Sequence, residues 1–548
     1  MGALLSSIVN WLVGPEPATE SRPGHLWPRW IFLRALGLIY FSAFHSLLFQ
    51  ITGLIGPTGI LPAGDYLQAV SGAIHSQRFW FAPTLLWFGA SNHALLAICW
   101  AGMIASLLLV LNFWPRATLA VCFVCFLSFV SAAQDFSGYQ SDGMLLEAGF
   151  ISLFFAPPGF RPSLGRAHPP SRLSRFLLQW EWFRIYFESG IAKIASGDLA
   201  WRNLTAMDDY YQNGPLPTWL GWYVQQLPHW FHAFAVVLTL AIELILVWML
   251  FLPRRFRIIC FFIVTPFEIS IILTANYTFL NYLVLMLGFL LLDDRFIEWI
   301  VPQKIRQLID SSPPPDAADP RPAADAAAPP PQENWRARIR KIFAPAGMAL
   351  AAVCLLWVLY ATSAQLVWML FRGLPLPETP VRLLEPFRIA NRYGLFAVMT
   401  HGRYEIEFQG SRDGKSWLPY PFRYKPQDVA QPPGIYAPYQ PRFDWNLWFA
   451  SLGSWRENHF VVYTEERLLR SDPDVLALFA ANPFAGGPPP AQVRAVIWQY
   501  WFTDLSAKRA QGIWWRRELL GAYAPALARQ PDGKIAFLDL PLAPPPPE

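Results

Sequence analysis

Charged residues are scarce in this sequence, and cysteines are few. Only 15% of the 548 residues are charged, whereas 54% are hydrophobic and the mean hydropathy is +0.27. Soluble domains contain about a quarter charged residues, so this composition excludes an ordinary water-soluble protein. The net charge of +5 is small for the length. We attribute it to loop arginines rather than to nucleic-acid binding, so no nucleic-acid partner is predicted.

The five cysteines all lie in apolar segments, at Cys99, Cys122, Cys125, Cys260 and Cys354. Residues 372–548 contain none, so disulfides cannot stabilise that part of the chain. Cys122 and Cys125 form a CxxC pair, which elsewhere can hold a metal or a redox centre. No second pair lies nearby, and we interpret it as apolar packing. Because no metal-ligand spacing, phosphate-binding loop or hydrolase motif occurs, the sequence predicts neither a metal nor a cofactor.

Long apolar windows dominate the first two thirds of the chain. A helix needs ~20 residues to cross a bilayer, and about nine windows approach that length. They fall at 31–52, 94–113, 117–133, 143–157, 176–196, 232–252, 258–274, 277–292 and 347–371. The windows at 143–157 and 277–292 are short, which predicts thin, tilted or re-entrant helices. Prolines interrupt 57–87, where we expect interfacial helices and loop.

The basic residues predict how these spans are oriented. With nine spans, five basic groups fall on one side of the membrane. They are Arg22, Arg29 and Arg34; Arg116; Arg161, Arg166, Arg172 and Arg175; Arg254, Arg255 and Arg257; and Arg336, Arg338, Arg340 and Lys341. Loops rich in Lys and Arg stay cytoplasmic. We therefore predict a cytoplasmic N-terminus and a non-cytoplasmic segment 372–548, which is periplasmic or exterior if the membrane is a bacterial inner membrane.

The fold class predicted is an all-α polytopic membrane bundle of about nine spans plus a C-terminal, β-sandwich-like soluble domain with helical additions. The boundaries expected are 1–30 for an N-terminal interfacial segment, 31–292 for eight spans, 293–346 for a linker, 347–371 for the last span and 372–548 for the soluble domain. Residues 311–333 are almost entirely Pro, Ala and Asp, a composition typical of disorder.

The tail carries a strong hairpin signal. Tyr404, Ile406 and Phe408 alternate with polar residues before Asp413-Gly414, and Tyr420, Phe422 and Tyr424 alternate after it. An Asp-Gly pair between two such runs predicts a tight turn between antiparallel strands. Further on, residues 463–480 and 491–505 are expected to be helices.

Ionisable residues inside predicted spans are candidates for a functional site, because they are costly in a membrane. They are Glu147, Arg184, Glu188, Lys193, Glu243 and Glu268. Glu181, Arg184 and Glu188 share one face of the fifth span at ~100° per residue, whereas Lys193 falls about 140° from Glu188. The alternative is a neutralised network that holds helices together. Pro266 kinks the helix before Glu268, which opens a cavity or simply suits the bundle.

Two polar clusters lie in predicted outer loops. One contains Gln134, Asp135 and Asp142 and ends at Glu147; the other contains Asp198, Trp201, Arg202 and Asn203. The functional interpretation is one polar site on the side of the tail. The alternative is loop capping and interfacial anchoring by tryptophan.

The tail segment from Tyr436 to Trp448 is dense in aromatic and polar residues. Its candidate client-binding residues are Tyr436, Tyr439, Arg442, Asp444, Trp445 and Trp448. Such side chains are typical of protein interfaces. They are equally typical of a loop that packs against the membrane face of the protein.

Several long blocks are similar to the lipase maturation factor family. They include QDFSGYQSDGMLLEAGFISLFFAP at 134–157, RIYFESGIAKIASGDLAWRNLTAM at 184–207 and RIANRYGLFAVMT at 388–400. Together with further blocks they cover most of 30–525, without the linker. The resemblance implies a membrane protein that assists the folding and assembly of secreted or exported proteins such as lipases. Expected partners are such a client and membrane lipids. Residues 210–214 depart from the family's pattern.

The segment IYFESGIAKIASGDLAW also resembles, more distantly, vitamin-K-dependent carboxylases. That resemblance implies an alternative: a membrane enzyme acting on a lipid or quinone, with Lys193 as a base. The carboxylase partner histidine would fall near Asp142, which is not a histidine. We therefore expect Lys193 to be structural, at the exposed end of its span and paired with Asp142.

Overall fold

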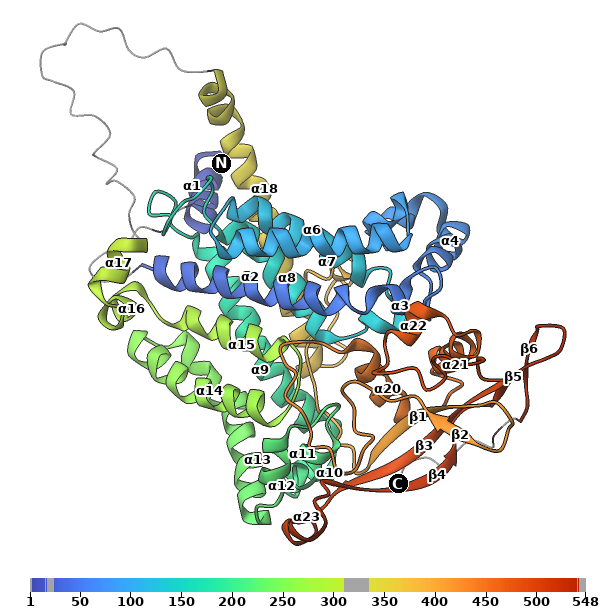
Figure 1. Cartoon of the computed structure of the whole chain (residues 1–548). Helices are drawn as coiled ribbons and strands as arrows, with labels where there is room; N and C mark the ends of the chain where they lie inside the picture. Colours follow the sequence, from blue (N-terminus) through green and yellow to red (C-terminus); the bar gives the residue numbers. More distant parts are fainter. Residues whose placement is uncertain (1, 15, 17–23, 310–334, 540, 542–548) are drawn as a thin grey trace, which may run out of the picture.

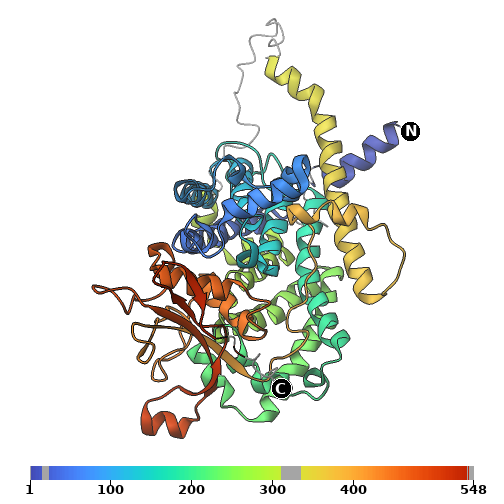
Figure 2. The same ribbon diagram turned by 90° about the vertical axis from the view of Figure 1, so that its right-hand side faces the viewer.

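The computed structural model describes residues 2–14, 16, 24–309, 335–539 and 541. Helices occupy the chain as far as Leu370, and a mixed α/β tail follows (Figure 1). Both views show the tail's sheet against one side of the helical region, away from the N-terminal helix (Figures 1 and 2). The predicted disordered segment 311–333 lies outside the described residues.

Five described helices are long and apolar enough to cross a membrane, which makes the chain a multi-pass membrane protein. They are α2 (Leu26–Leu48), α6 (Asn92–Val110), α13 (His229–Leu244) with its extension η4 (Leu246–Phe251), α14 (Arg254–Thr274) and Pro345–Leu370 of α18 (Trp335–Leu370). The other predicted spans also contain helices. These are α7 (Pro115–Val130), α8 (Gln140–Phe155), α9 (Arg172–Ser196) and α15 (Leu280–Gly288), which continues as η5 (Phe289–Leu291).

Local sequence sets the ends of several helices. The hydroxyl of Ser171 accepts the backbone N–H of Ser174 at the start of α9, which satisfies a free donor of the first turn. Gly197 ends the same helix at φ +79°, a left-handed conformation that suits glycine. Pro115 begins α7, where its missing N–H costs no hydrogen bond.

Shorter helices connect the long ones. In the first 140 residues they are α1 (Gly2–Val13), α3 (Ile51–Ile55), α4 (Ala63–Ile74), η1 (His75–Gln77), α5 (Arg78–Phe81), η2 (Leu85–Phe88) and η3 (Gln134–Ser137). Later come α10 (Leu199–Arg202), α11 (Ala206–Asn213), α12 (Trp219–Gln225), α16 (Asp294–Ile300) and α17 (Gln303–Ile309). The broken helices expected over 57–87 are thus present as α4, η1, α5 and η2.

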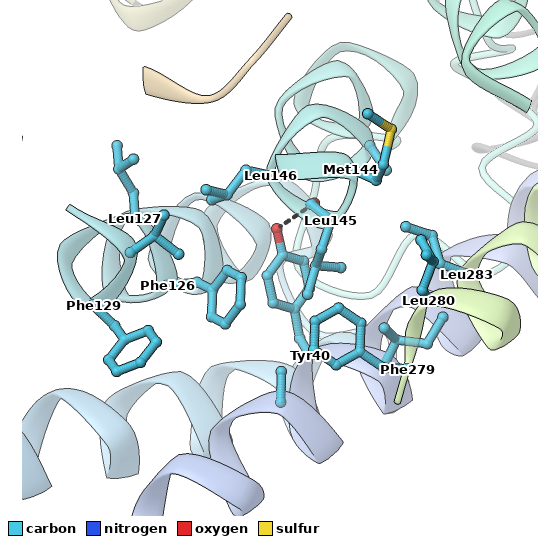
Figure 3. Close-up of a cluster of buried hydrophobic side chains, with 14 of the residues drawn as sticks. Tyr40, Phe126, Leu127, Phe129, Met144, Leu145, Leu146, Phe279, Leu280 and Leu283 are labelled. Atoms are coloured by element: carbon cyan, nitrogen blue, oxygen red, sulfur yellow. Dashed lines mark hydrogen bonds between the residues drawn. The ribbon is translucent and has the colours of Figure 1, made fainter. Parts of the chain in front are cut away.

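Large apolar side chains from four helices form the centre of the bundle (Figure 3). Tyr40 of α2 lies beside Phe126 of α7, with ring centroids 6.0 Å apart. The Tyr40 hydroxyl donates to the backbone carbonyl of Leu145 in α8 at 3.1 Å. This bond satisfies a fully buried hydroxyl, which would otherwise destabilise the core.

The tail contains one antiparallel, six-stranded sheet in the described residues. Its strands are β1 (Arg403–Ser411), β2 (Trp417–Pro419), β3 (Gln492–Phe502), β4 (Trp515–Ala522), β5 (Leu527–Arg529) and β6 (Ile535–Phe537). The order is β2-β1-β3-β5-β6, and β4 also pairs with β3. The predicted hairpin is confirmed: Ser411 pairs with Trp417, and Gly414 has φ +71° in the turn.

The helix predicted over 491–505 is wrong, because Gln492–Phe502 is strand β3 and pairs with all nine residues of β1. Its β-branched and aromatic residues suit a half-buried strand, and long-range pairing decides between two conformations that a short apolar run leaves open. The strand expected around Phe422 and Tyr424 is also shorter, since β2 ends at Pro419.

A second sheet of a sandwich is not confirmed among the described residues. Instead, helices cover one face of the sheet: α20 (Arg442–Ser451) packs on β1, and α21 (Phe460–Arg470) packs on β3. Phe408 of β1 stacks on Phe443 of α20 at 6.4 Å. The remaining tail helices are α19 (Thr379–Arg382), η6 (Glu385–Phe387), α22 (Pro473–Leu476) and α23 (Leu505–Gln511).

Candidate functional site

The first polar cluster holds the tail domain against the bundle. The guanidinium of Arg442, at the start of α20, donates to both carboxylate oxygens of Asp142 at 2.8 Å each. It also donates to the carbonyl of Phe136 at 2.8 Å. Both partners of the ion pair are fully buried. Such a two-pronged Arg–carboxylate contact sets the orientation of the two parts as well as their attraction.

The charged face predicted on α9 lies deeper in the same contact region. Arg184 pairs closely with Glu147 of α8 and lies 3.7 Å from Glu188, one turn along its own helix. The tail completes the network through its backbone. The N–H of Asn391 donates to Glu147 at 2.8 Å, the carbonyl of Asn391 accepts from Arg184 at 2.7 Å, and the N–H of Tyr393 donates to Glu188 at 2.7 Å. Arg184 thus faces two carboxyl groups, and backbone N–H groups of the tail supply further partners for both.

The second polar cluster receives the next part of the tail. Asp198 caps α10 by accepting the N–H of Ala200 at 2.9 Å, and its other oxygen accepts the N–H of Met399 at 2.6 Å. The indole N–H of Trp201 donates to the carbonyl of Phe396 at 3.0 Å. We call the combined contact region, formed by residues 388–403 and 434–446 of the tail on the two polar clusters, the docking seam.

Four residues of the predicted polar site lie apart from these contacts. Asp135, Arg202 and Asn203 are exposed. Gln134 donates to the carbonyl of Leu61 at 3.3 Å, within the helical region rather than to the tail. The two sequence clusters thus contribute to the docking seam mainly through Asp142, Glu147, Asp198 and Trp201.

The expectations for Lys193 were partly wrong. Its ammonium group pairs with Glu243 of α13, with N–O distances of 2.8 and 2.9 Å, and not with Asp142. The side chain is 4% exposed, so it does not extend to the surface. Helix geometry explains the difference: Lys193 lies about 140° around α9 from Glu188, so it faces α13 while Glu188 faces the tail.

The stretch from Tyr436 to Trp448 packs against the bundle and is not an open surface. Arg442, Asp444, Trp445 and Trp448 are buried, while Tyr436 and Tyr439 are half-buried. The N–H of Tyr436 donates to Asn276 at 2.7 Å, and the hydroxyl of Tyr439 accepts from Gln50 at 3.2 Å. The expectation of exposed client-binding side chains is corrected here, because four of the six are buried and Arg442 and Tyr439 hydrogen bond to the helical region.

Several residues of the docking seam could not be predicted from the sequence. Arg403 at the start of β1 is fully buried and donates to the carbonyls of Gln212, Gly214 and Pro215. Asn276 donates to the carbonyl of Gly434 at 2.9 Å. Arg403 gave no signal, since an arginine at a strand start is ordinarily exposed. Asn276 offered a weak one, as an amide at the end of an apolar helix.

A cavity of about 390 Å³ lies beside the seam, between α9, α11, α13, α14 and α15. Its acidic and basic side chains are the Lys193–Glu243 pair and Glu268, whose carboxylate accepts the Tyr186 hydroxyl at 2.5 Å. Glu268 follows Pro266 in α14. Of the two alternatives for this proline, a cavity or a simple fit to the bundle, a cavity is therefore found beside it. In the described part of the chain, no group of three His, Cys, Asp or Glu side chains is placed to hold a metal.

Comparison with known proteins identifies this architecture. The transmembrane-domain model of the lipase maturation factors matches residues 27–299, and their C-terminal-domain model matches residues 389–525. The chain belongs to the lipase maturation factor family. Lipase maturation factor 1 of Bos taurus is 31% identical, over 93% of this chain and 90% of the relative. Lipase maturation factor 1 of Homo sapiens is 30% identical, over 94% and 92%.

Lipase maturation factor 2 of Gallus gallus is 31% identical, over 91% of this chain and 81% of the relative. No solved structure matches significantly. In this lipase maturation factor-like protein, the docking seam joins the two family regions: Asp142, Glu147 and Glu188 lie in the first, and Asn391 and Arg442 in the second. The carboxylase alternative gains no support from these relatives, and Lys193 is paired with Glu243 while Asp142 is held by Arg442.

Proposed function

We propose that the protein assists the folding or assembly of a secreted or exported client of the lipase type. The names of its relatives support the type of client. The observation that carries the proposal is the docking seam, which joins the α/β tail domain to the helical bundle through buried ion pairs and hydrogen bonds. Buried charges in such a seam favour one orientation, and a fixed orientation suits a platform on which another chain folds.

The topology proposed with this function has nine spans. The proposal counts the five candidate spans, the shorter helices α7, α8 and α15, and the 25-residue α9. The basic groups support a cytoplasmic N-terminus, a tail domain 372–548 on the other side and residence in a bacterial inner membrane. Under this proposal, 31–292 and 347–371 form the membrane part and 293–346 the cytoplasmic linker. The linker was expected to be disordered throughout, but its described residues include helices α16 and α17 and the start of α18. A reporter that fluoresces only in the cytoplasm, fused after Glu548, should stay dark; bright cells would refute the orientation.

We propose that the client contacts strand β4 rather than the buried stretch 436–448. β4 pairs with β3 on one side, and Leu519 and Leu520 on it are 49% and 48% exposed. An edge strand that carries exposed leucines can add an extended segment of another chain by backbone hydrogen bonding. Arg516 and Glu518 on the same strand limit unselective pairing, as charged side chains do on natural edge strands.

Site-specific photocrosslinking tests this proposal. A photoreactive amino acid at Leu519 should trap a newly exported lipase during its synthesis. The matched control is the same amino acid at Tyr463, which is 44% exposed on α21 and away from the β4 edge. A crosslink of equal yield from both positions, or from neither, would contradict client binding at β4.

A further inference from the structure

The cavity between α13 and α14 is lined mainly by apolar and aromatic side chains. Ten of its lining side chains are aromatic, among them Tyr186, Tyr210, Tyr277 and Phe396. Its volume of about 390 Å³ falls in the range typical of small-molecule sites, roughly 300–1,000 Å³. A mostly apolar cavity that ends in a few buried polar groups suits an amphiphile.

The cavity opens toward lipid. Phe234 and Leu238 of α13 line it and are 58% and 37% exposed, and Ser270 of α14 lines it and is also exposed. These residues lie on the candidate spans His229–Phe251 and Arg254–Thr274, of which only 33% and 22% is buried within the protein. Because the exposed faces of these two spans meet the bilayer, a lipid can enter sideways without crossing water.

The cavity is lined by more acidic than basic side chains. Lys193 is neutralised by Glu243, to which it donates twice. Glu268 is 3% exposed and accepts from Tyr186, and Asn281 also hydrogen bonds to it. No ion pair of Glu268 is found in the described ranges, so the cavity holds two carboxyl groups and one ammonium group. A cationic ligand would supply Glu268 with a charged partner, since the partners of this carboxyl group among the described residues are the neutral side chains of Tyr186 and Asn281.

Aromatic faces beside this carboxyl group favour the same kind of ligand. The rings of Tyr210, Tyr277 and Phe396 form one cluster, with centroids 5.1–6.2 Å apart. Ring faces attract ammonium groups through their quadrupoles. We propose that the cavity binds a membrane amphiphile with an ammonium head group, which contacts Glu268 and the aromatic cluster while its chain leaves between α13 and α14.

Binding there is coupled to docking of the tail. Tyr393, Leu395 and Phe396 belong to the tail segment and line the cavity. The backbones of Tyr393 and Phe396 are also held in the docking seam by Glu188 and Trp201. An amphiphile that contacts these side chains binds the docked state better, and therefore stabilises the seam.

The test uses the full-length protein, stripped of lipid in a neutral detergent, and three probes with one chain length: hexadecylamine, hexadecanol and hexadecanoate. Thermal unfolding is followed by tryptophan fluorescence. Hexadecylamine should raise the midpoint by about 2–4 °C and bind at least about tenfold more tightly than the alcohol. Glu268→Gln keeps the shape and the acceptor for Tyr186 but should abolish the preference for the amine.

Glu378→Gln removes an exposed carboxyl group that pairs with Arg382 at the surface and should leave the preference unchanged. Ser270→Trp fills the lateral opening while keeping Glu268, so it should weaken all three probes; it decides the question if Glu268→Gln does not fold. An equal response to the amine and the alcohol would overturn the ammonium assignment, as would a stronger response to hexadecanoate. An unchanged amine response in both cavity variants would show binding elsewhere.

Discussion

Replacing Arg442 by methionine should separate the tail domain from the bundle. The change leaves Asp142 as a buried carboxylate without its cation and the Phe136 carbonyl without its donor. Removing one partner of a fully buried pair costs about 3–5 kcal/mol. For a tail of this size that lowers the thermal midpoint by at least about 6 °C. Limited proteolysis during heating, with a protease that cuts the tail, measures the loss.

Two further variants make this prediction specific. Asp142→Leu combined with Arg442→Met removes both charges, so the double variant should be more stable than Arg442→Met alone. Arg470→Met breaks an exposed pair with Glu466, whose side chains are 52% and 36% exposed, and should cost no more than about 1 kcal/mol. If Arg442→Met melts like the wild type, the docking seam does not depend on this pair and the reasoning fails.

Four other outcomes are expected. Burial raises the pKa of Asp444 from 3.8 to about 6. The protonated side chain therefore contributes stability that is fully present below about pH 4 and is lost as the pH rises through 6. Asp444→Asn should remove about 3 kcal/mol of this pH dependence in urea titrations. Gly414→Val should destabilise the full-length protein by about 1 kcal/mol or more, because Gly414 has φ +71°; an unaltered urea midpoint would contradict that. Lys193→Arg should retain the ion pair with Glu243 and support client maturation, whereas Lys193→Met should lower the amount of protein in the membrane. If an abundant, folded Lys193→Arg protein fails to mature the client, Lys193 acts as a catalytic base instead. Deleting 312–331 should leave expression unchanged in a membrane blot.

The membrane helices could be predicted because hydropathy is a local property. Each apolar window contains a helix, and the Asp413-Gly414 turn has the geometry its residues favour. Strand β3 could not be predicted in the same way. Its partner β1 lies more than 80 residues earlier in the chain, and a short apolar run fits either a helix or a strand until that pairing is known.

The polar residues of the site could be chosen from sequence, because charges inside apolar segments are costly and need partners. Their partners could not. Lys193 was predicted to pair with Asp142, and only the packing of α13 against α9 makes Glu243 its partner. Trp445 illustrates the same limit. The aromatic and polar composition of the stretch around it suits an exposed interface and a buried contact equally, and the structure leaves this side chain only 7% exposed.

The most direct test of the central claim is the specific activity of an exported lipase, measured as enzyme activity per mass of secreted lipase. It is compared in cells with the chain, without it, and with the Arg442→Met variant restored. The account predicts a fall of at least about tenfold without the chain, little recovery with Arg442→Met, and unchanged amounts of unrelated exported proteins. Full specific activity in cells that lack the chain would contradict it.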